Sequence, residues 1–287
     1  MPLQFNEFYD GNTGLTIGIK RLLFSKQTQY QLVEVYETES WGNLMVIDGM
    51  VMLSEKDEFV YHEMLTHVPL FTHPNPEAVL IIGGGDGGTA REVMKHPSVK
   101  KVDLVEIDES VVEASKRYLP EIGDFDNPKL QLHIQDGISF INTVSSTYDV
   151  ILIDGSDPVG PAEGLFKKDF FESCYLALSA QGVLATQTET PWVDSYHLSI
   201  RNVYSYLNSV FKYTSMYLCY IPLYPSGMWS MMCASRSDDP AGEDVLKRSE
   251  EKVNKIEGLR YYNPGIHQSS FALPGFVSDL LSVDIGF

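Results

Sequence analysis

The side chains best suited to chemistry in this sequence are carboxylates that stand beside glycines. Asp86 lies inside the run 83–88, which reads Gly-Gly-Gly-Asp-Gly-Gly, and Asp154 and Asp157 lie in the run 154–161, which reads Asp-Gly-Ser-Asp-Pro-Val-Gly-Pro. Glycine lets the backbone turn sharply and approach a ligand closely, whereas a carboxylate attracts cations and repels phosphates. Asp154 or Asp157 alone is also compatible with a helix cap or an Asx-turn. Together the two runs predict a site for a ligand that carries positive charge.

The glycine run also has the pattern of a nucleotide-binding turn. Gly83, Gly85 and Gly88 satisfy Gly-x-Gly-x-x-Gly after an apolar stretch and before a helical one, which is the context that such a turn requires. The pattern alone fits a dinucleotide or a nucleoside such as S-adenosylmethionine equally well. Asp86 favours the nucleoside, because its charge would repel a pyrophosphate at the helix N-terminus.

Further acidic residues follow the next two apolar stretches. Glu106 comes 18 residues after Gly88, where a carboxylate can accept hydrogen bonds from both ribose hydroxyls. Asp136 can accept from an adenine amine, and Gly137 leaves room for the ring. The competing interpretation is that Glu106 and Asp136 only cap the helices that follow them. Taken together, the glycine run and the two acidic loops favour adenosine as part of the ligand.

These residues need a parallel sheet to bring them together. Apolar strands at 79–82, 102–106, 130–134, 150–153 and 183–186 alternate with helical segments, which predicts an α/β fold with a doubly wound sheet of the Rossmann type. Strand-like alternation from 18 to 54 predicts a small N-terminal antiparallel β domain. We therefore expect a β domain at 1–60 and a catalytic domain at 61–287, with a hairpin at 215–222 and 228–235 added to the sheet.

Composition excludes several classes of protein. The 21 Lys and Arg residues and 39 Asp and Glu residues give a net charge of −18, which disfavours nucleic acid as a partner. No apolar stretch approaches the roughly 20 residues of a membrane span, and the N-terminus resembles no targeting segment, so a cytoplasmic location with no membrane partner is expected. The three scattered cysteines form no metal-binding pattern, and we expect no metal.

Several motifs in combination resemble the polyamine aminopropyltransferase family. They are the runs 83–88 and 154–161 together with Asp-Glu-Phe-Val-Tyr-His-Glu at 57–63, Tyr-Pro-Ser-Gly at 224–227 and Tyr-Tyr-Asn-Pro at 261–264. The resemblance extends from about residue 30 to residue 274. The glycine run is shared with methyltransferases, whereas the combination is specific to the family.

The resemblance implies a methyltransferase-like Rossmann fold and an aminopropyl transfer. The donor would be decarboxylated S-adenosylmethionine, a co-substrate rather than a cofactor, and the acceptor putrescine, with spermidine and 5′-methylthioadenosine as products. Asp86 fits this donor, which has an ammonium and no carboxylate. The residues implied in nucleoside binding are Gln31, Gly83, Asp86, Glu106, Ile107, Asp136, Gly137 and Pro161.

A base is needed because an amine attacks carbon only after it loses a proton. Asp154 is our candidate for this proton acceptor, with Tyr61 as its helper and Asp157 and Tyr224 orienting the amine. The far ammonium of the acceptor is expected near Glu189 and Trp192, whose carboxylate and aromatic face suit a cation. The residues implied in polyamine binding are therefore His62, Asp86, Asp154, Asp157, Glu189, Trp192 and Tyr224.

Other functions remain compatible with parts of the pattern. Met52 stands where many similar sequences have Gln, which leaves the preferred length of the acceptor open among putrescine, cadaverine and spermidine. An S-adenosylmethionine-dependent diamine N-methyltransferase would share the fold, although Asp86 argues against it. A non-catalytic polyamine or nucleoside sensor would need no proton acceptor, and a nicotinamide dehydrogenase is disfavoured by Asp86. Edge strands in the β domain and the resemblance both predict a homodimer or homotetramer.

Overall fold

Residues 3–54 form a five-stranded antiparallel meander in the computed structural model, which describes residues 3–156 and 160–282. Its strands, in spatial as in chain order, are β1 (Leu3–Phe8), β2 (Gly14–Gln27), β3 (Leu32–Thr38), β4 (Asn43–Ile47) and β5 (Met50–Ser54). Asp48 and Gly49 both have positive φ, at 50° and 82°, as a tight hairpin turn requires. The strands expected from residue 18 onward are preceded by β1 and the start of β2. Most side chains of β1 and β2 are exposed or half-buried, so their alternation is weak in the sequence.

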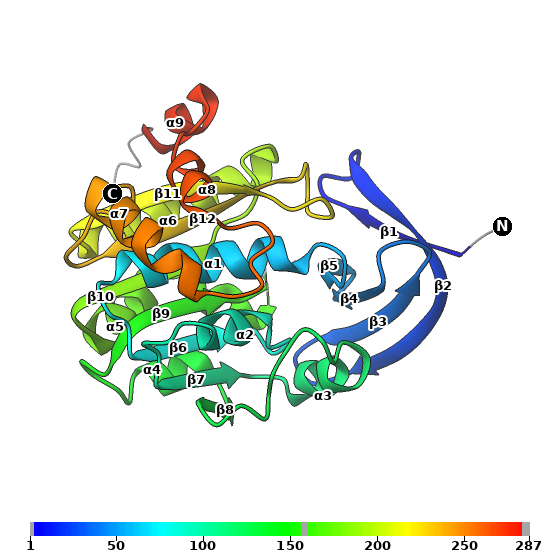
Figure 1. Cartoon of the computed structure of the whole chain (residues 1–287). Helices are drawn as coiled ribbons and strands as arrows, with labels where there is room; N and C mark the ends of the chain where they lie inside the picture. Colours follow the sequence, from blue (N-terminus) through cyan, green and yellow to red (C-terminus); the bar gives the residue numbers. More distant parts are fainter. Residues whose placement is uncertain (1–2, 157–159, 283–287) are drawn as a thin grey trace.

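The second sheet has seven strands in the order β11-β12-β10-β9-β6-β7-β8 (Figure 1). The five strands from β10 to β8 in this order are parallel, and β12 and β11 add an antiparallel hairpin at one edge. The predicted doubly wound sheet with its added hairpin is therefore confirmed. The strand bounds are β6 (Ala78–Gly83), β7 (Lys101–Glu106), β8 (Leu130–Ile134), β9 (Tyr148–Asp154), β10 (Leu178–Gln187), β11 (Tyr213–Tyr220) and β12 (Met228–Ser235).

Helices cover both faces of this second sheet. α1 and α2 belong to one apolar core, and α5 and α6 belong to the core on the opposite face. The α-helices are α1 (Glu58–Thr72), α2 (Gly88–Met94), α3 (Glu109–Tyr118), α4 (Gly137–Ile141), α5 (Lys168–Ala177), α6 (His197–Val210), α7 (Glu243–Lys252), α8 (Pro264–Ser270) and α9 (Gly275–Ser282), and the 3₁₀ helices are η1 (Gly160–Phe166), η2 (Asp194–Tyr196) and η3 (Val253–Lys255). The domain division predicted at residue 60 falls inside α1, because β5 ends at Ser54 and the helix begins at Glu58.

The order of the strands creates a crevice at their carboxyl ends. The chain runs outward from β6 to β7 and β8 and then returns to place β9 on the other side of β6. Ligands of doubly wound folds bind at such a switch point, where the connections from neighbouring strands diverge. The N-terminal sheet closes this crevice from one side, since Val33, Val35 and Met45 pack against Val111 and Ala114 of α3.

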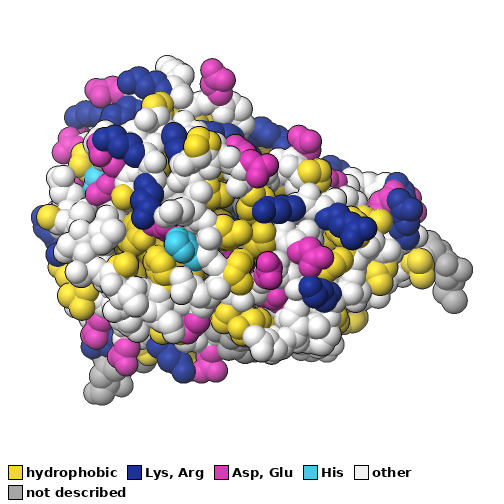
Figure 2. All heavy atoms as spheres, turned by 90° about the horizontal axis from the view of Figure 1, so that it is seen from below, with side chains coloured by type: hydrophobic (Ala, Val, Ile, Leu, Met, Phe, Trp, Pro, Cys, Tyr) yellow, Lys and Arg dark blue, Asp and Glu magenta, His cyan; other side chains and the backbone are white. Residues whose placement is uncertain are grey.

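Charged side chains of both signs are interspersed on the face seen in Figure 2. The negative net charge is therefore not gathered into one acidic patch on this face. None of the helices described within 3–156 and 160–282 is both long and apolar enough to cross a membrane.

Candidate active site

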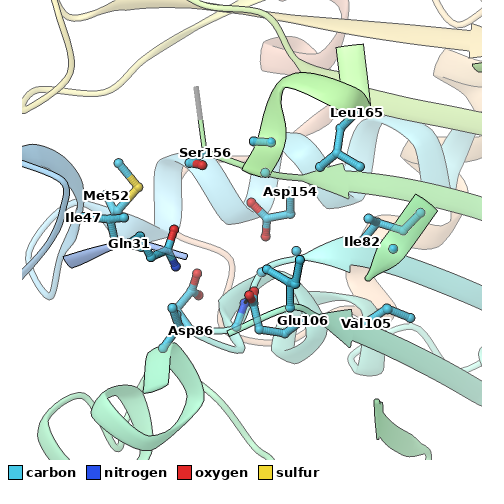
Figure 3. A pocket seen from close by; sticks show the side chains of 18 of the residues that line it. Gln31, Ile47, Met52, Ile82, Asp86, Val105, Glu106, Asp154, Ser156 and Leu165 are labelled. Atoms are coloured by element: carbon cyan, nitrogen blue, oxygen red, sulfur yellow. Dashed lines mark hydrogen bonds between the residues drawn. The ribbon is translucent and has the colours of Figure 1, made fainter. Parts of the chain in front are cut away.

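A cavity of about 910 Å³, part of it open to solvent, lies in the crevice between the two sheets (Figure 3). Gln31 and Met52 from the N-terminal sheet face Asp86, Glu106 and Asp154 across it. Its lining residues are Gln31, Met45, Ile47, Met52, Tyr61, His62, Ile82, Gly83, Gly84, Gly85, Asp86, Val105, Glu106, Ile107, Val111, Asp136, Gly137, Asp154, Gly155, Ser156, Ala162, Leu165 and Tyr224.

The glycine loop between β6 and α2 forms the floor of the cavity. Gly84 has φ of +69°, and a Cβ atom there would lie 2.6 Å from Oδ2 of Asp154. A side chain at Gly88 would lie 2.3 Å from the His62 ring. These positions are glycine because the loop turns through left-handed conformations while two functional side chains pack directly against it.

The nucleoside half of the cavity is built around Glu106 at the end of β7. Its two carboxylate oxygens accept hydrogen bonds from the backbone N–H groups of Gly85, at 3.1 Å, and Asp108, at 2.9 Å. Burial raises the pKa of Glu106 to about 7 despite these bonds. Asp136 lies at the next strand end, where it lines the cavity and also caps α4 through the N–H of Ile138. The capping and binding interpretations of Asp136 are thus compatible.

Gln31 reaches the cavity from the turn before β3. The Thr28 hydroxyl accepts the backbone N–H of Gln31 and donates to Asp108 Oδ2 at 2.8 Å. Asp108 also caps α3 through the N–H of Ser110. This contact ties the N-terminal sheet to the catalytic domain beside the nucleoside half of the cavity.

Asp86 and His62 form one part of the charged half. Asp86 Oδ1 lies 3.1 Å from Nε2 of His62 and also accepts the backbone N–H of Gly88 at 2.7 Å. The other ring nitrogen, Nδ1, lies 2.5 Å from Oε2 of Glu58. Burial alone would lower the pKa of His62, but the carboxylates of Asp86 and Glu58 together raise it to about 10. His62 is therefore an imidazolium at neutral pH.

Asp154, at the end of β9, forms the other part of the charged half. Thr89 donates its hydroxyl to Asp154 Oδ2 at 2.6 Å. Burial and then the negative charge of Asp86 raise the pKa of Asp154 to about 6, whereas the hydrogen bonds from Thr89 and Tyr61 oppose the rise. A carboxylate with this pKa is ionised at neutral pH and is a better proton acceptor than an ordinary Asp.

The charged half is suited to an organic cation rather than a metal ion. Ligand atoms of His62, Asp86 and Asp154 all lie within 4.8 Å of one another. Both ring nitrogens of His62 face carboxylates, so both carry protons and neither offers a lone pair to a metal. The two Asp carboxylates can instead accept hydrogen bonds from an ammonium group.

A second hollow of about 360 Å³ continues from the charged half. It shares Met52, Tyr61, Gly155, Ser156 and Tyr224 with the main cavity. Its further lining residues are Glu7, Met50, Val51, Gln187, Pro225 and Trp229. The hollow therefore extends from the charged half toward a buried carboxylate, Glu7 of β1.

Two residues expected at the far end of the acceptor do not line either hollow. Glu189 is fully buried behind the site, next to Gln187, which accepts its backbone N–H. Trp192 is 59% exposed, and its ring packs at a tilt against Phe276 of α9. Asp157 lies outside the described residues, as does the side chain of Pro161. Every other residue predicted for the site lines the main cavity.

The contacts of four residues at the site were not anticipated from the sequence. They involve Glu7, Glu58, Thr89 and Arg91. Glu58 and His62 are spaced i, i+4 on α1, which is a signal that a helical reading of 58–72 could have used. Thr89 and Arg91 follow the glycine loop without a distinguishing pattern, and Glu7 lies on a strand that the sequence did not predict.

The chain matches two known domain families along most of its length. Residues 58–241 match the spermine/spermidine synthase domain, and residues 3–55 match the spermidine synthase tetramerisation domain. The boundary between the two matched segments coincides with the connection from β5 to α1.

Proteins that are similar along nearly the whole chain belong to the same family. The chain is 47% identical over 282 residues to the polyamine aminopropyltransferase of Bacillus cereus (strain ATCC 10987 / NRS 248), covering 98% of this chain and 100% of that protein. Identity to the polyamine aminopropyltransferase of Bacillus subtilis (strain 168) is 46%, covering 97% and 99%. The fold is similar to that of Thermotoga maritima spermidine synthase, with a TM-score of 0.90, 42% identity and coverage of 98% and 95%. A spermidine synthase solved with the transition-state analogue AdoDATO gives a TM-score of 0.92 at 42% identity, covering 98% and 96%.

Proposed function

This chain belongs to the spermine/spermidine synthase family and is a polyamine aminopropyltransferase, and we propose that it converts putrescine to spermidine. The proposed donor is decarboxylated S-adenosylmethionine, which leaves as 5′-methylthioadenosine. One observation carries the proposal: two buried carboxylates, Asp86 and Asp154, stand together at the end of a cavity whose other half suits a nucleoside. That a 42% identical spermidine synthase binds the transition-state analogue AdoDATO supports a co-substrate of this kind.

Asp86 selects the decarboxylated donor in this proposal. The donor's aminopropyl chain ends in an ammonium, which pairs with the Asp86 carboxylate. Ordinary S-adenosylmethionine would bring its own carboxylate close to Asp86, and two buried like charges repel strongly. Glu106 accepts from the ribose hydroxyls, Asp136 and Gly137 hold the adenine, and Gln31 reaches the nucleoside from the N-terminal sheet.

Asp154 accepts the proton that the acceptor amine must lose. The freed lone pair then attacks the methylene carbon next to sulfur, a C–N bond forms, and the C–S bond breaks with its electrons moving to sulfur. The sulfonium becomes a neutral thioether, so no covalent intermediate, metal or further cofactor takes part. Tyr61 and Tyr224 line the position of the amine, and catalysis comes from proximity and from carboxylates held ready for the charge.

The acceptor's second ammonium lies in the 360 Å³ hollow, toward Glu7. This hollow begins beside Tyr61 and is lined by apolar side chains such as Met52 before it reaches the Glu7 carboxylate. An aliphatic diamine has the same succession of ammonium, methylenes and ammonium. We keep a role for Asp157 from the family resemblance and assign the distal ammonium to Glu7 in place of Glu189 and Trp192.

The protein acts as a homo-oligomer in this proposal, as a dimer or a tetramer. The match of residues 3–55 to a tetramerisation domain supports self-association through the N-terminal sheet. The cytoplasmic location stays a prediction from the sequence, and so does the absence of nucleic-acid and membrane partners.

The direct test is a product analysis. Purified protein is mixed with putrescine and either decarboxylated or ordinary S-adenosylmethionine, and the products are identified by mass spectrometry. We expect spermidine and 5′-methylthioadenosine from the decarboxylated donor only. Asp154→Asn should abolish most of this activity, whereas Asp169→Asn, on the exposed surface of α5, serves as the matched control and should retain it.

Other products would overturn the proposal. Methylputrescine with S-adenosylhomocysteine would make the protein a diamine N-methyltransferase. Absence of product with putrescine, cadaverine and spermidine alike, despite ligand binding, would make it a sensor.

A further inference from the structure

We propose that Glu58 is a positioning residue for the donor: it holds His62 as a cation whose Nε2 fixes one oxygen of Asp86 and leaves the other for the aminopropyl ammonium. The inference rests on the proposed function. It concerns a buried carboxylate of α1 that does not line the main cavity and therefore reaches the substrate only through His62.

Four side chains of alternating charge contact one another in the order Arg91, Glu58, His62 and Asp86. Arg91 of α2 donates to both oxygens of Glu58, at 3.1 and 2.9 Å. Glu58 Oε2 lies 2.5 Å from Nδ1 of His62, and Nε2 lies 3.1 Å from Oδ1 of Asp86. Glu58 and His62 are 7% and 2% exposed, so solvent screens these interactions very little.

The His62 ring has no room to turn away from this arrangement. The Cα of Gly88 packs so closely that a Cβ atom there would lie 2.3 Å from the ring. Gly88 also donates its backbone N–H to Asp86 Oδ1 at 2.7 Å. Oδ1 thus receives two donors, whereas no hydrogen bond or ion pair within the described part of the chain involves Oδ2, which leaves that oxygen for the donor's ammonium.

The charge on His62 also separates the roles of two neighbouring carboxylates. Two carboxylates this close, buried in the same site, cannot both ionise easily. Burial raises the pKa of Asp86, but the His62 cation outweighs it, so the pKa falls below its ordinary value. Asp154 instead has its pKa raised to about 6. His62 thereby keeps Asp86 a permanent anion for binding and leaves Asp154 to accept the proton.

The groups that set the protonation of His62 come from four places. Glu58 lies on α1 with it, Asp86 on the glycine loop, Asp154 at the end of β9, and Arg91 on α2 behind Glu58. Without the charge of Glu58, burial and Arg91 favour a neutral ring against Asp86 alone, so the pKa of His62 falls from about 10. A neutral ring that donates through Nδ1 presents a lone pair at Nε2 to Oδ1 of Asp86, and the repulsion displaces the carboxylate whose other oxygen binds the donor.

The experiment compares two ligands that differ in the aminopropyl group and in the positive charge that this group gives to sulfur. Dissociation constants of decarboxylated S-adenosylmethionine and 5′-methylthioadenosine are measured by calorimetry from pH 7 to pH 9, where Asp154, with a pKa of about 6, stays largely ionised. The ratio of the two constants isolates the aminopropyl subsite, because general damage or titration in the nucleoside half changes both. In the wild type we expect this ratio to stay constant across the range.

Glu58→Gln should make the ratio pH-dependent. We expect near wild-type discrimination at pH 7 and a roughly tenfold to hundredfold loss by pH 9, the range that one charge-assisted hydrogen bond supports. Arg91→Gln is the matched control, since it breaks the same Glu58–Arg91 ion pair but leaves the negative charge beside His62. Its ratio should stay constant with pH.

Three results would refute the inference: a flat ratio in Glu58→Gln, an equal loss of affinity for both ligands, or the same pH dependence in Arg91→Gln. If Glu58→Gln does not fold, NMR of Cε1-labelled histidine in the wild type decides instead. The His62 signal, identified by its loss in His62→Gln, should keep its imidazolium position to pH 9, and titration near pH 6.5 would refute the inference. A wild type that makes no spermidine would refute the proposed function itself, whereas an active wild type with a flat ratio in Glu58→Gln would refute only the role of Glu58.

Discussion

Removing the Thr89 hydroxyl of α2 should raise the pKa of Asp154, the proposed proton acceptor. Thr89 is fully buried and donates its hydroxyl to Asp154 Oδ2 at 2.6 Å. This bond stabilises the ionised form of Asp154 and opposes the effect of burial on its pKa. Thr89→Val replaces the hydroxyl with a methyl group of similar size, so the packing of the helix is retained while the hydrogen bond is lost.

The size of the effect follows from the strength of a hydrogen bond to a charged group. Such a bond is worth about 1.5 to 3 kcal/mol, and one pKa unit corresponds to about 1.4 kcal/mol. The pKa of Asp154, about 6 in the wild type, should therefore rise by about one to two units in Thr89→Val. At pH 7 the ionised fraction then falls from about nine tenths to between about one half and one tenth, which lowers kcat/KM about two- to tenfold.

The assay is the pH profile of kcat/KM for putrescine at saturating donor. The acid limb should move to higher pH in Thr89→Val, whereas at pH 9 the two enzymes should differ little, because Asp154 is ionised in both. Thr89→Ser, which keeps a hydroxyl, should retain the wild-type acid limb. An unshifted limb in Thr89→Val, or an equal loss of activity at every pH, would show that Thr89 does not set the pKa of the base.

Two further predictions concern stability. Asp154→Asn should stabilise the protein by up to about 3 kcal/mol above pH 7, because the folded-state pKa is raised from 3.8 to about 6 and ionisation therefore opposes folding at higher pH. The gain should disappear below about pH 4, where Asp154 is protonated in both folded and unfolded states, and denaturant titrations at pH 4 and pH 8 that gave equal differences would contradict this. Glu63→Gln should destabilise the protein by about 2 to 3 kcal/mol, since the buried Glu63 carboxylate accepts the backbone N–H groups of Arg260, Tyr261 and Tyr262 at 2.7 to 2.9 Å. Chemical denaturation measures this loss, and a change below 0.5 kcal/mol would mean that these three bonds contribute little.

The sequence by itself determined the catalytic domain and the nucleoside half of the site. Each parallel strand is a short apolar run, and its last residue is followed by a loop at a common edge of the sheet. Glu106 and Asp154 end two such runs, and Asp86 and Asp136 follow two others. Their meeting could be predicted because strand direction alone places them at one edge.

The half of the cavity proposed for the acceptor could not be predicted from the sequence, because segments far apart in the chain form it. The far end of its hollow is formed by Glu7 of β1, at the opposite end of the chain from Trp229 of β12, and no local pattern links the two strands. Glu189 was expected there because its carboxylate suits a cation. Glu189 follows β10, whose neighbour β12 is antiparallel, and it is buried behind the site rather than exposed to the cavity.

Only the tertiary structure decided which carboxylate binds and which accepts a proton. Asp86 and Asp154 are the same side chain with the same ordinary pKa, and spacing in the sequence does not distinguish them. Their difference comes from the His62 cation in contact with Asp86, which lowers the pKa of Asp86, and from the negative charge of Asp86, which adds to burial in raising the pKa of Asp154. Such effects act over a few ångströms and become strong only where water is excluded, so they exist only after α1, α2 and β9 have packed together.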